Sequence, residues 1–395
     1  MTGPSNASSA SALGPLFVVV LSTLGVGLTF GYQPPLIALI LERGGASSFE
    51  IGLVTAASTI AVILLGPLYP RAIAGLGVRT AIIVGTVATI IAMLAMPLLT
   101  SVPAWFALRF ATGCGLGLEW IASEVWLNRL ATDDTRGRVM GFYATAFAAG
   151  VVAGPVLLQF TGTTGWRPFV VGAVGLAITV APLVGVTQAP GAGQDLRNAR
   201  PITALIRAAP VVMLTALVAG LIESADLSLL PLFGLYSGLA ERTALMLVTV
   251  FLAGNVVLQL PIGAIGDRRG RRRVLMLCAI TSAIGPLLLP GVLSVPALLW
   301  PLLFLWGGTM YAFYTQGIAL LGETFPVEEL AAANTAYVMT YCAGGVIGPS
   351  LGGLAMDLWK PRGFIVFVSL ASALMIVGLS IEARRVSRWS AGRIQ

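Results

Sequence analysis

Residues 263–273 read GAIGDRRGRRR and separate two apolar runs, at about 243–265 and 273–292. The glycines allow helix ends to pack closely, and Asp267 can meet either an arginine or the positive end of a neighbouring helix. The arginines that follow hold the turn at a membrane surface. Because each flanking run is long enough to cross a bilayer, the stretch predicts two membrane helices joined by a short basic loop.

The rest of the chain has the composition of a protein whose solvent is lipid. Of its 395 residues, 57% are hydrophobic and 10% are charged, whereas soluble proteins are roughly 25% charged. At roughly 20 apolar residues per span, the length fits about twelve spans. We therefore predict an all-α integral membrane protein with twelve transmembrane helices, at about 14–41, 50–73, 78–99, 103–128, 138–161, 166–187, 210–235, 243–265, 273–292, 296–321, 332–356 and 363–382.

The basic residues predict how these helices are oriented. With the N-terminus in the cytoplasm, 17 of the 23 Lys and Arg residues fall on the cytoplasmic side, 5 fall outside, and Arg109 lies within a helix. Cytoplasmic loops carry such an excess, so we expect both termini in the cytoplasm. The single lysine among many arginines favours a bacterial source, and hence the cytoplasmic (inner) membrane. This distribution explains the net charge of +7 without a nucleic-acid partner.

The chain also repeats itself at an offset of 194 residues. The stretch YATAFAAGVVAGP, which begins at Tyr143, aligns without gaps on YVMTYCAGGVIGP, which begins at Tyr337. Such internal repeats occur in many secondary transporters. We predict two pseudo-symmetric six-helix halves, organised as a disordered cytoplasmic tail at 1–13, an N-terminal half at 14–187, a polar cytoplasmic linker at 188–209, a C-terminal half at 210–382 and a cytoplasmic tail at 383–395.

The loop at 263–273 resembles the signature G-x-x-x-D-R-x-G-R-R of the major facilitator superfamily, a family of twelve-helix transporters. A reduced copy follows the second predicted helix, where Pro70 stands in the place of the family's Asp. The carboxylate of Glu124 is a candidate substitute, and Glu323 holds the equivalent place in the second half. The resemblance implies a conformational role for Gly66, Arg71, Glu124, Gly263, Asp267, Arg268, Gly270, Arg271 and Glu323.

Helices 5 and 11 resemble the family's antiporter element G-x-x-x-G-P. Its residues are Gly150, Gly154 and Pro155 in the first half and Gly344, Gly348 and Pro349 in the second. Small faces of this kind let helices approach closely, and proline kinks a helix. We expect these faces to bring helices of the two halves together. As a sign of antiport the element is only moderately specific, because G-x-x-x-G is common wherever helices pack.

Three acidic residues, Glu119, Glu223 and Asp226, lie inside predicted helices. The last two are three residues apart and share a helix face, and two close carboxyl groups in a low-dielectric site suit proton binding. The alternative is that these acids pair with Arg109 or polar groups and only join helices. In the family, helices 1, 4, 7 and 10 line the cavity, so the resemblance implies cavity roles for Gln33, Arg109, Glu119, Glu223, Asp226, Tyr311, Tyr314 and Gln316.

The absence of histidine and the positions of the cysteines limit the metal sites and the proton carriers that this protein can have. The chain has no histidine, and its three cysteines are scattered through apolar runs, so we expect no metal site and no cofactor, and protons must be carried by carboxylates. No catalytic cluster favours an enzyme.

We predict a monomeric secondary transporter whose partners are a small-molecule substrate, protons and membrane lipid. Proton antiport (efflux) of a small neutral or cationic amphipathic solute is the first choice. The alternatives are a proton-coupled importer of a small polar metabolite and a lipid-translocating protein on the same fold.

Overall fold

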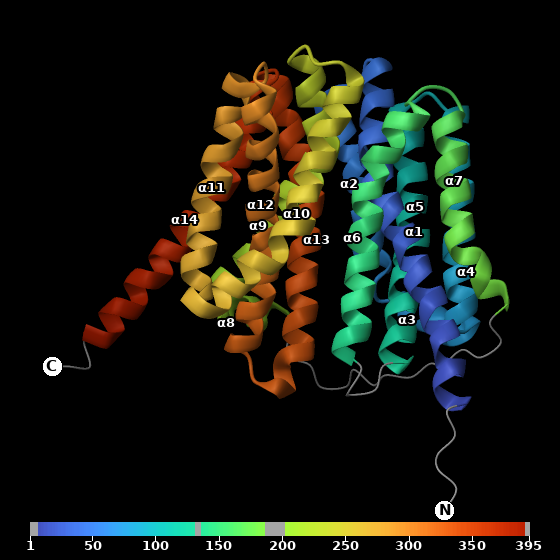
Figure 1. The fold of residues 1–395 in the computed structure, drawn as a ribbon, viewed down its shortest axis with the longest axis horizontal. Coiled ribbons are helices and arrows are strands. Elements are labelled where there is room, and N and C mark those ends of the chain that lie inside the picture. The colour runs from blue at the N-terminus through green and yellow to red at the C-terminus, as the bar shows by residue number, and fades with distance from the viewer. Residues whose placement is uncertain (1–6, 131–135, 186–201, 392–395) are drawn as a thin grey trace, which may run out of the picture. The chain divides into compact units, whose positions relative to one another are not determined.

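The computed structural model describes residues 7–130, 136–185 and 202–391, and within these ranges the chain is helical, with no strand. The chain divides into two compact units: the first is Met1–Ile40 with Ala57–Asp195, and the second is Leu41–Ala56 with Leu196–Gln395. The helices up to the linker (Figure 1) are α1 (Ala7–Arg43), α2 (Ser48–Leu65), α3 (Tyr69–Leu76), α4 (Val78–Ala95), the 3-10 turn η1 (Met96–Leu98), α5 (Val102–Leu130), α6 (Arg136–Thr161), α7 (Arg167–Val180) and η2 (Ala181–Gly185). Those after it are α8 (Ile202–Ala208), α9 (Pro210–Tyr236), α10 (Glu241–Arg269), α11 (Arg271–Val292), α12 (Pro296–Thr324), α13 (Val327–Leu358) and α14 (Arg362–Ala391).

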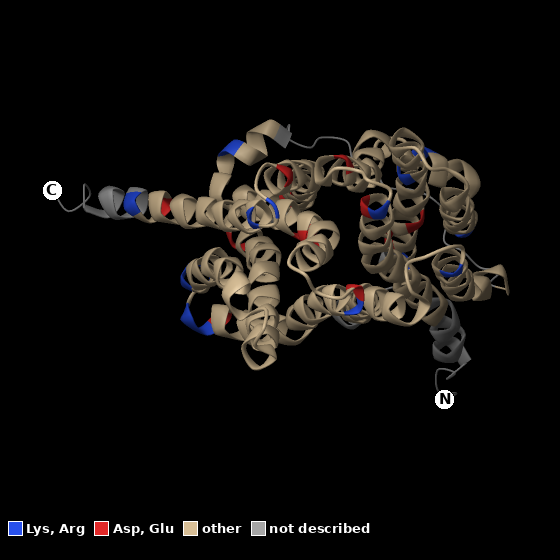
Figure 2. Ribbon diagram, turned by 90° about the horizontal axis from the view of Figure 1, so that it is seen from above, with Lys and Arg blue, Asp and Glu red and all other residues tan. Residues whose placement is uncertain are grey.

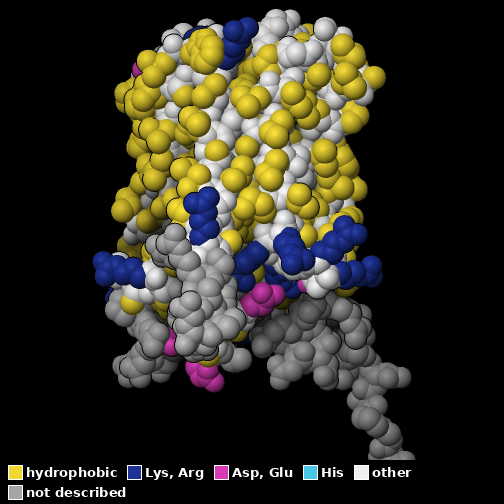
Figure 3. Space-filling model, turned by 90° about the vertical axis from the view of Figure 1, so that its left-hand side faces the viewer, with side chains coloured by type: hydrophobic (Ala, Val, Ile, Leu, Met, Phe, Trp, Pro, Cys, Tyr) yellow, Lys and Arg dark blue, Asp and Glu magenta, His cyan; other side chains and the backbone are white. Residues whose placement is uncertain are grey.

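The helices have the length and surface of membrane spans. Eleven in the described part of the chain are long and apolar enough to cross a bilayer, and α5 is a twelfth helix of sufficient length, made less apolar by Arg109, Glu119 and Glu124. Charged residues are sparse along the helices (Figure 2). Large apolar side chains face outward, such as Leu260, which is 84% exposed. On the face in Figure 3, hydrophobic side chains form a tall band and Lys and Arg gather near its lower end. The predicted all-α membrane fold is confirmed.

The helices depart from the predicted ranges most clearly at three places. The run at 50–73 is two helices, because Gly66 and Pro67 interrupt the backbone hydrogen bonding between α2 and α3. Helix α1 begins at Ala7, within the predicted tail at 1–13, since a Ser- and Ala-rich segment is compatible with a helix. At the other end α14 extends to Ala391, into the predicted tail at 383–395. Much of the predicted linker lies outside the described residues, and α8 occupies part of the remainder.

Glycines permit close helix packing inside each unit. In the first unit a Cβ at Gly150 or at Gly154 would overlap the backbone of α1, and in the second a Cβ at Gly344 or at Gly348 would overlap the backbone of α9. The antiporter-like glycines therefore pack α6 on α1 and α13 on α9, each within its own unit. These contacts lie inside each unit, and the expectation that the same faces join the two halves stays a prediction. Pro155 and Pro349 lie inside α6 and α13, as predicted.

The turn between α1 and α2 groups with the second unit. Arg43, at the end of α1, forms an ion pair with Glu241 at 2.8 Å. The carboxylate of Asp357 on α13 accepts hydrogen bonds from the backbone N–H groups of Ser48 (2.9 Å) and Phe49 (2.8 Å), the first residues of α2. A carboxylate at this position satisfies donors that every helix leaves free at its start. The second unit thus anchors the beginning of α2.

Candidate functional site

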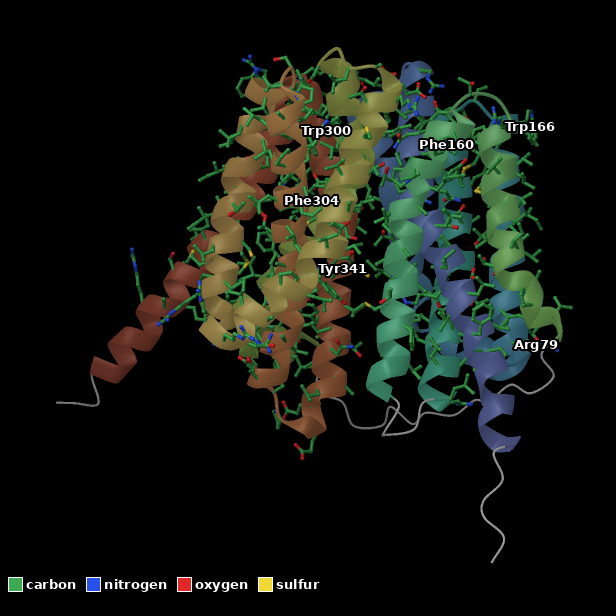
Figure 4. The ribbon with its side chains drawn as sticks, viewed as in Figure 1. Arg79, Phe160, Trp166, Trp300, Phe304 and Tyr341 are labelled. Carbon is green, nitrogen blue, oxygen red and sulfur yellow. The ribbon has the colours of Figure 1, made fainter. Side chains whose placement is uncertain are left out.

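The acid pair predicted on the seventh membrane helix lies on α9 of the second unit. Asp226 is completely buried, and neither of its carboxyl oxygens has a hydrogen-bond partner. Glu223 accepts a hydrogen bond from the hydroxyl of Tyr341 on α13 at 2.7 Å, and Figure 4 shows Tyr341 on that helix. Tyr311 of α12 is also buried and lies near both acids. The structure therefore brings together three of the predicted site residues.

Tyrosines from two helices surround this pair. The ring of Tyr314 on α12 lies 5.1 Å from that of Tyr341 and 5.3 Å from that of Tyr337, between centroids. Tyr337 donates its hydroxyl to the carbonyl oxygen of Tyr314 at 2.9 Å, and its hydroxyl lies 2.9 Å from that of Thr215 on α9. This network fixes the tyrosine rings next to the acids. Tyr314 was predicted from the sequence but Thr215 was not, because its role depends on the packing of α9 against α13.

The first unit holds the arginine that was predicted for the cavity. Arg109 on α5 is 5% exposed and donates a hydrogen bond from Nη1 to the side-chain oxygen of Gln33 on α1. Gln33 is 1% exposed. No ion pair of Arg109 with an acid occurs in the described part of the chain. A guanidinium held by a neutral amide keeps its positive charge uncompensated, so this pair is able to attract an anionic or polar group.

Glu119 does not lie beside Arg109. It is on the same helix, ten residues on, which is a rise of about 15 Å. Its backbone and Cβ pack against Gly85 on α4, and its side chain is 0% exposed. The alternative in which Glu119 pairs with Arg109 is therefore not seen within the first unit.

The repeat places aromatic residues at equivalent positions in the first unit. Trp120 and Phe147 correspond, at the 194-residue offset, to Tyr314 and Tyr341. Their rings stack at 5.7 Å, and Phe30 of α1 meets Trp120 edge-on at 5.5 Å. These half-buried rings form an apolar counterpart to the tyrosines of the second unit.

Glu124 belongs to this aromatic group. Its Oε1 accepts hydrogen bonds from the indole Nε1 of Trp120 at 2.8 Å and from the hydroxyl of Tyr143 at 3.2 Å. Both donors point at a residue that was predicted to belong to a conformational motif. The arrangement joins α5 to α6 inside the first unit.

The loop between α10 and α11 contains a short ion-pair network. Arg271 contacts Asp267 at 2.5 Å and Glu323 of α12 at 2.7 Å. Gly270 has a φ of 91°, which only glycine adopts without strain, and connects the two helices. Gly263 has no atom within contact range of its missing Cβ, and Arg268 is exposed. A pocket of 570 Å³ opens beside this network. The predicted meeting of Asp267 with an arginine is present.

The reduced copy of this loop in the first unit is built differently. Gly66 begins the turn after α2, and Arg71 on α3 is exposed. Arg79, at the start of α4, donates to the carbonyl oxygens of Leu183 (2.9 Å) and Val184 in η2. In Figure 4, Arg79 lies at this end of the unit. An arginine therefore satisfies carbonyl groups at a helix end, where cations are favourable.

Gln316 is turned away from the acid pair of α9. It is 1% exposed, its Nε2 lies 3.4 Å from the carbonyl oxygen of Ile262, and its amide would overlap a Cβ at Gly266. Its environment is therefore the α10–α12 interface.

The geometry combines long apolar helices, buried carboxyl groups and a basic loop between two spans. The family model described as Major Facilitator Superfamily matches residues 16–247 and 236–394. The chain belongs to the major facilitator superfamily. It is a multi-pass membrane protein of the transporter class and not an enzyme, as the sequence predicted.

Relatives and solved structures agree with this placement. The chain is 26% identical to the uncharacterized MFS-type transporter YfkF of Bacillus subtilis, covering 95% of this chain and 96% of that one. It is 23% identical to the uncharacterized MFS-type transporter YcaD of Escherichia fergusonii, covering 94% and 97%. The nucleoside transporter NupG has a TM-score of 0.73 at 16% identity, covering 93% and 98%. The D-xylose-proton symporter has 0.72 at 17%, covering 93% and 95%. These structures show the shared fold.

Proposed function

We propose that this facilitator is a proton-coupled transporter of the bacterial cytoplasmic membrane, with both termini in the cytoplasm. It works by alternating access, and its first-choice reaction is proton antiport that exports a small neutral or cationic amphipathic solute. Glu223 and Asp226 bind the protons, and the tyrosines around them offer aromatic surface to the solute.

The environment of the acid pair supports this proposal most directly. In the described part of the second unit, none of the ion pairs includes Glu223 or Asp226. A charged carboxylate inside a membrane protein costs several kcal/mol unless it is compensated. Protonation removes that charge, so proton binding and release change the energy of this part of the molecule. The hydrogen bond from Tyr341 lowers the cost of a negative charge on Glu223 but not on Asp226.

The charges inside the helices favour a neutral or cationic solute. Away from the ends of the predicted spans, Arg109 is the one basic residue, against the three acids Glu119, Glu223 and Asp226. Aromatic faces attract cations and planar apolar groups. These features are compatible with an amphipathic cation more than with an anion.

Import of a polar metabolite with protons remains the second candidate. The observation that favours it is the likeness of the fold to a nucleoside transporter and to a D-xylose-proton symporter. The polar pair Gln33–Arg109 offers hydrogen bonds of the kind that a hydroxylated solute uses. Direction of transport therefore decides between the two candidates.

Proteoliposomes with an imposed pH gradient test the proposal. Ethidium serves as the exported probe, uridine and D-xylose as imported probes, and a fluorescent phospholipid as the lipid probe. Wild-type protein is expected to move ethidium against its gradient. The double variant Glu223→Gln with Asp226→Asn is expected to lose this movement but retain exchange at equal pH, because amides preserve size and some hydrogen bonds.

The matched control is Glu241→Gln, which removes a carboxylate from the exposed pair with Arg43 and leaves the acid pair intact. Normal pH-driven accumulation by the double variant would show that the α9 acids are structural. Proton-driven uptake of uridine or D-xylose would favour import, and lipid movement alone would favour a lipid-translocating protein.

A further inference from the structure

Glu119 forms a second isolated acid, inside the first unit. Its side chain is 0% exposed, and neither Oε1 nor Oε2 has a hydrogen-bond partner. Gly85 of α4 packs so closely that an added Cβ there would lie 3.3 Å from the Cβ of Glu119. The carboxyl group therefore lies within the tight interface of α4 and α5, where a negative charge is costly.

The elements packed around Glu119 provide no cation for it. Arg79 donates to carbonyl oxygens of η2, Arg71 is exposed, and Arg109 is held by Gln33. The titratable or charged side chains with described positions on these neighbouring elements and on α5 itself are Tyr32, Glu42 and Arg43 of α1, Tyr69 and Arg71 of α3, Arg79 of α4, Arg109, Cys114, Glu124 and Arg129 of α5, and Tyr143 of α6. No ion pair joins any of them to Glu119 in the described ranges.

The polar group beside the carboxyl is Thr86 of α4. Its hydroxyl donates to the carbonyl oxygen of Ile82 at 2.9 Å, so its hydrogen is already engaged. The hydroxyl oxygen can still accept a hydrogen bond. A protonated Glu119 is able to donate to it while Thr86 keeps its bond to Ile82, whereas an ionised Glu119 gains a hydrogen bond from Thr86 only if the hydroxyl turns away from Ile82. The site is chemically complementary to the acid that carries a proton.

Two further unpartnered polar atoms continue along the same face of α5. Ser123 and Trp126 are four and seven residues beyond Glu119, which places all three on one side of a helix. Ser123 is 1% exposed and Trp126 is 0% exposed, and neither the hydroxyl Oγ nor the indole Nε1 has a hydrogen-bond partner. Buried polar atoms without partners are costly and uncommon in native proteins. Trp126 packs in a hydrophobic cluster with Ile82 and Leu127, so the hydroxyl of Ser123 is the group of the two that is able to accept and pass on a proton in the direction of Leu130.

We propose that Glu119 is a proton-binding site of the first unit, separate from the acid pair of α9, and that Ser123 lies on the route by which its proton exchanges with water at the Leu130 end of α5. The transporter then has one proton site in each unit. The role of this site in transport rests on the proposed proton coupling, but the binding of a proton at Glu119 does not.

Infrared difference spectroscopy of the full-length protein in liposomes tests the proposal without any substrate. The probe is the proton itself, observed by the C=O stretch of a protonated carboxyl group as the pH is raised. Wild-type protein is expected to show a titrating band that disappears in Glu119→Gln, survives in the Glu223→Gln, Asp226→Asn double variant, and returns at a shifted position in Glu119→Asp. Ser123→Ala is expected to slow the hydrogen–deuterium shift of this band.

Three results would each contradict one of the two proposals. If Glu119→Gln leaves the titrating bands unchanged, Glu119 binds no exchangeable proton and the inference fails, whatever the transport assays show. If the band is present but does not change with pH, Glu119 is a permanently neutral packing residue, which also overturns it. A failure of pH-driven transport in the wild type, with the Glu119 band intact, would instead refute the proposed function alone.

Discussion

The anchoring of α2 by Asp357 leads to a quantitative prediction. Its carboxylate accepts two backbone hydrogen bonds, at 2.9 and 2.8 Å, from Ser48 and Phe49. Lys360 is 3.9 Å from the same carboxylate, and the Asp357 side chain is 23% exposed. Loss of a helix-capping side chain costs about 0.5–2 kcal/mol. Because two donors lose a charged acceptor here, we expect Asp357→Ala to destabilise the protein by about 2 kcal/mol, the upper part of that range.

The same helix start offers a matched control. Ser47 and Glu50 form a capping box, in which Glu50 accepts from the Ser47 backbone N–H at 2.8 Å. Glu50→Gln retains an acceptor, so its effect is expected to be about 1 kcal/mol or less. Thermal unfolding in detergent micelles measures both: a melting temperature lowered by several degrees in Asp357→Ala and by little in Glu50→Gln is the expected result. Equal melting temperatures for wild type and Asp357→Ala would refute the anchoring role.

Three further outcomes are expected. Gly348→Ala forces a Cβ into a carbonyl of α9 and is expected to cost about 1–3 kcal/mol, whereas Gly263→Ala, with open space at its Cβ, is expected to leave the melting temperature nearly unchanged; equal effects would contradict the packing argument. Asp267→Asn breaks a pair whose carboxylate side is 60% exposed, so we expect a change of about 0.2–1 kcal/mol that salt diminishes; a larger, salt-independent loss would be inconsistent with an exposed pair. A reporter fused after Gln395 is expected to read cytoplasmic, and a periplasmic signal would rule out the arginine-based topology.

The sequence by itself determined the solvent, the number of membrane-spanning helices and the family. Long apolar runs must form helices in lipid because every backbone polar group has to be satisfied within its own segment. The number of arginines in each loop and the motif at 263–273 are likewise properties of short stretches of sequence. The structure contains the predicted contact between Asp267 and an arginine, Arg271. The acid pair of α9 could also be predicted from the sequence, because residues three apart share a helix face whatever surrounds them.

Only the tertiary structure decided which polar groups meet. Asp357 contacts a helix start 309 residues away, Gln316 turns toward α10, and Glu119 packs on α4 apart from Arg109. Membrane helices are apolar on nearly all sides, so their sequences contain little periodic signal to show which face packs on which neighbour. That choice depends on side-chain shape and on close backbone approach at glycines such as Gly85 and Gly348, which arises only when segments distant in the chain are packed together.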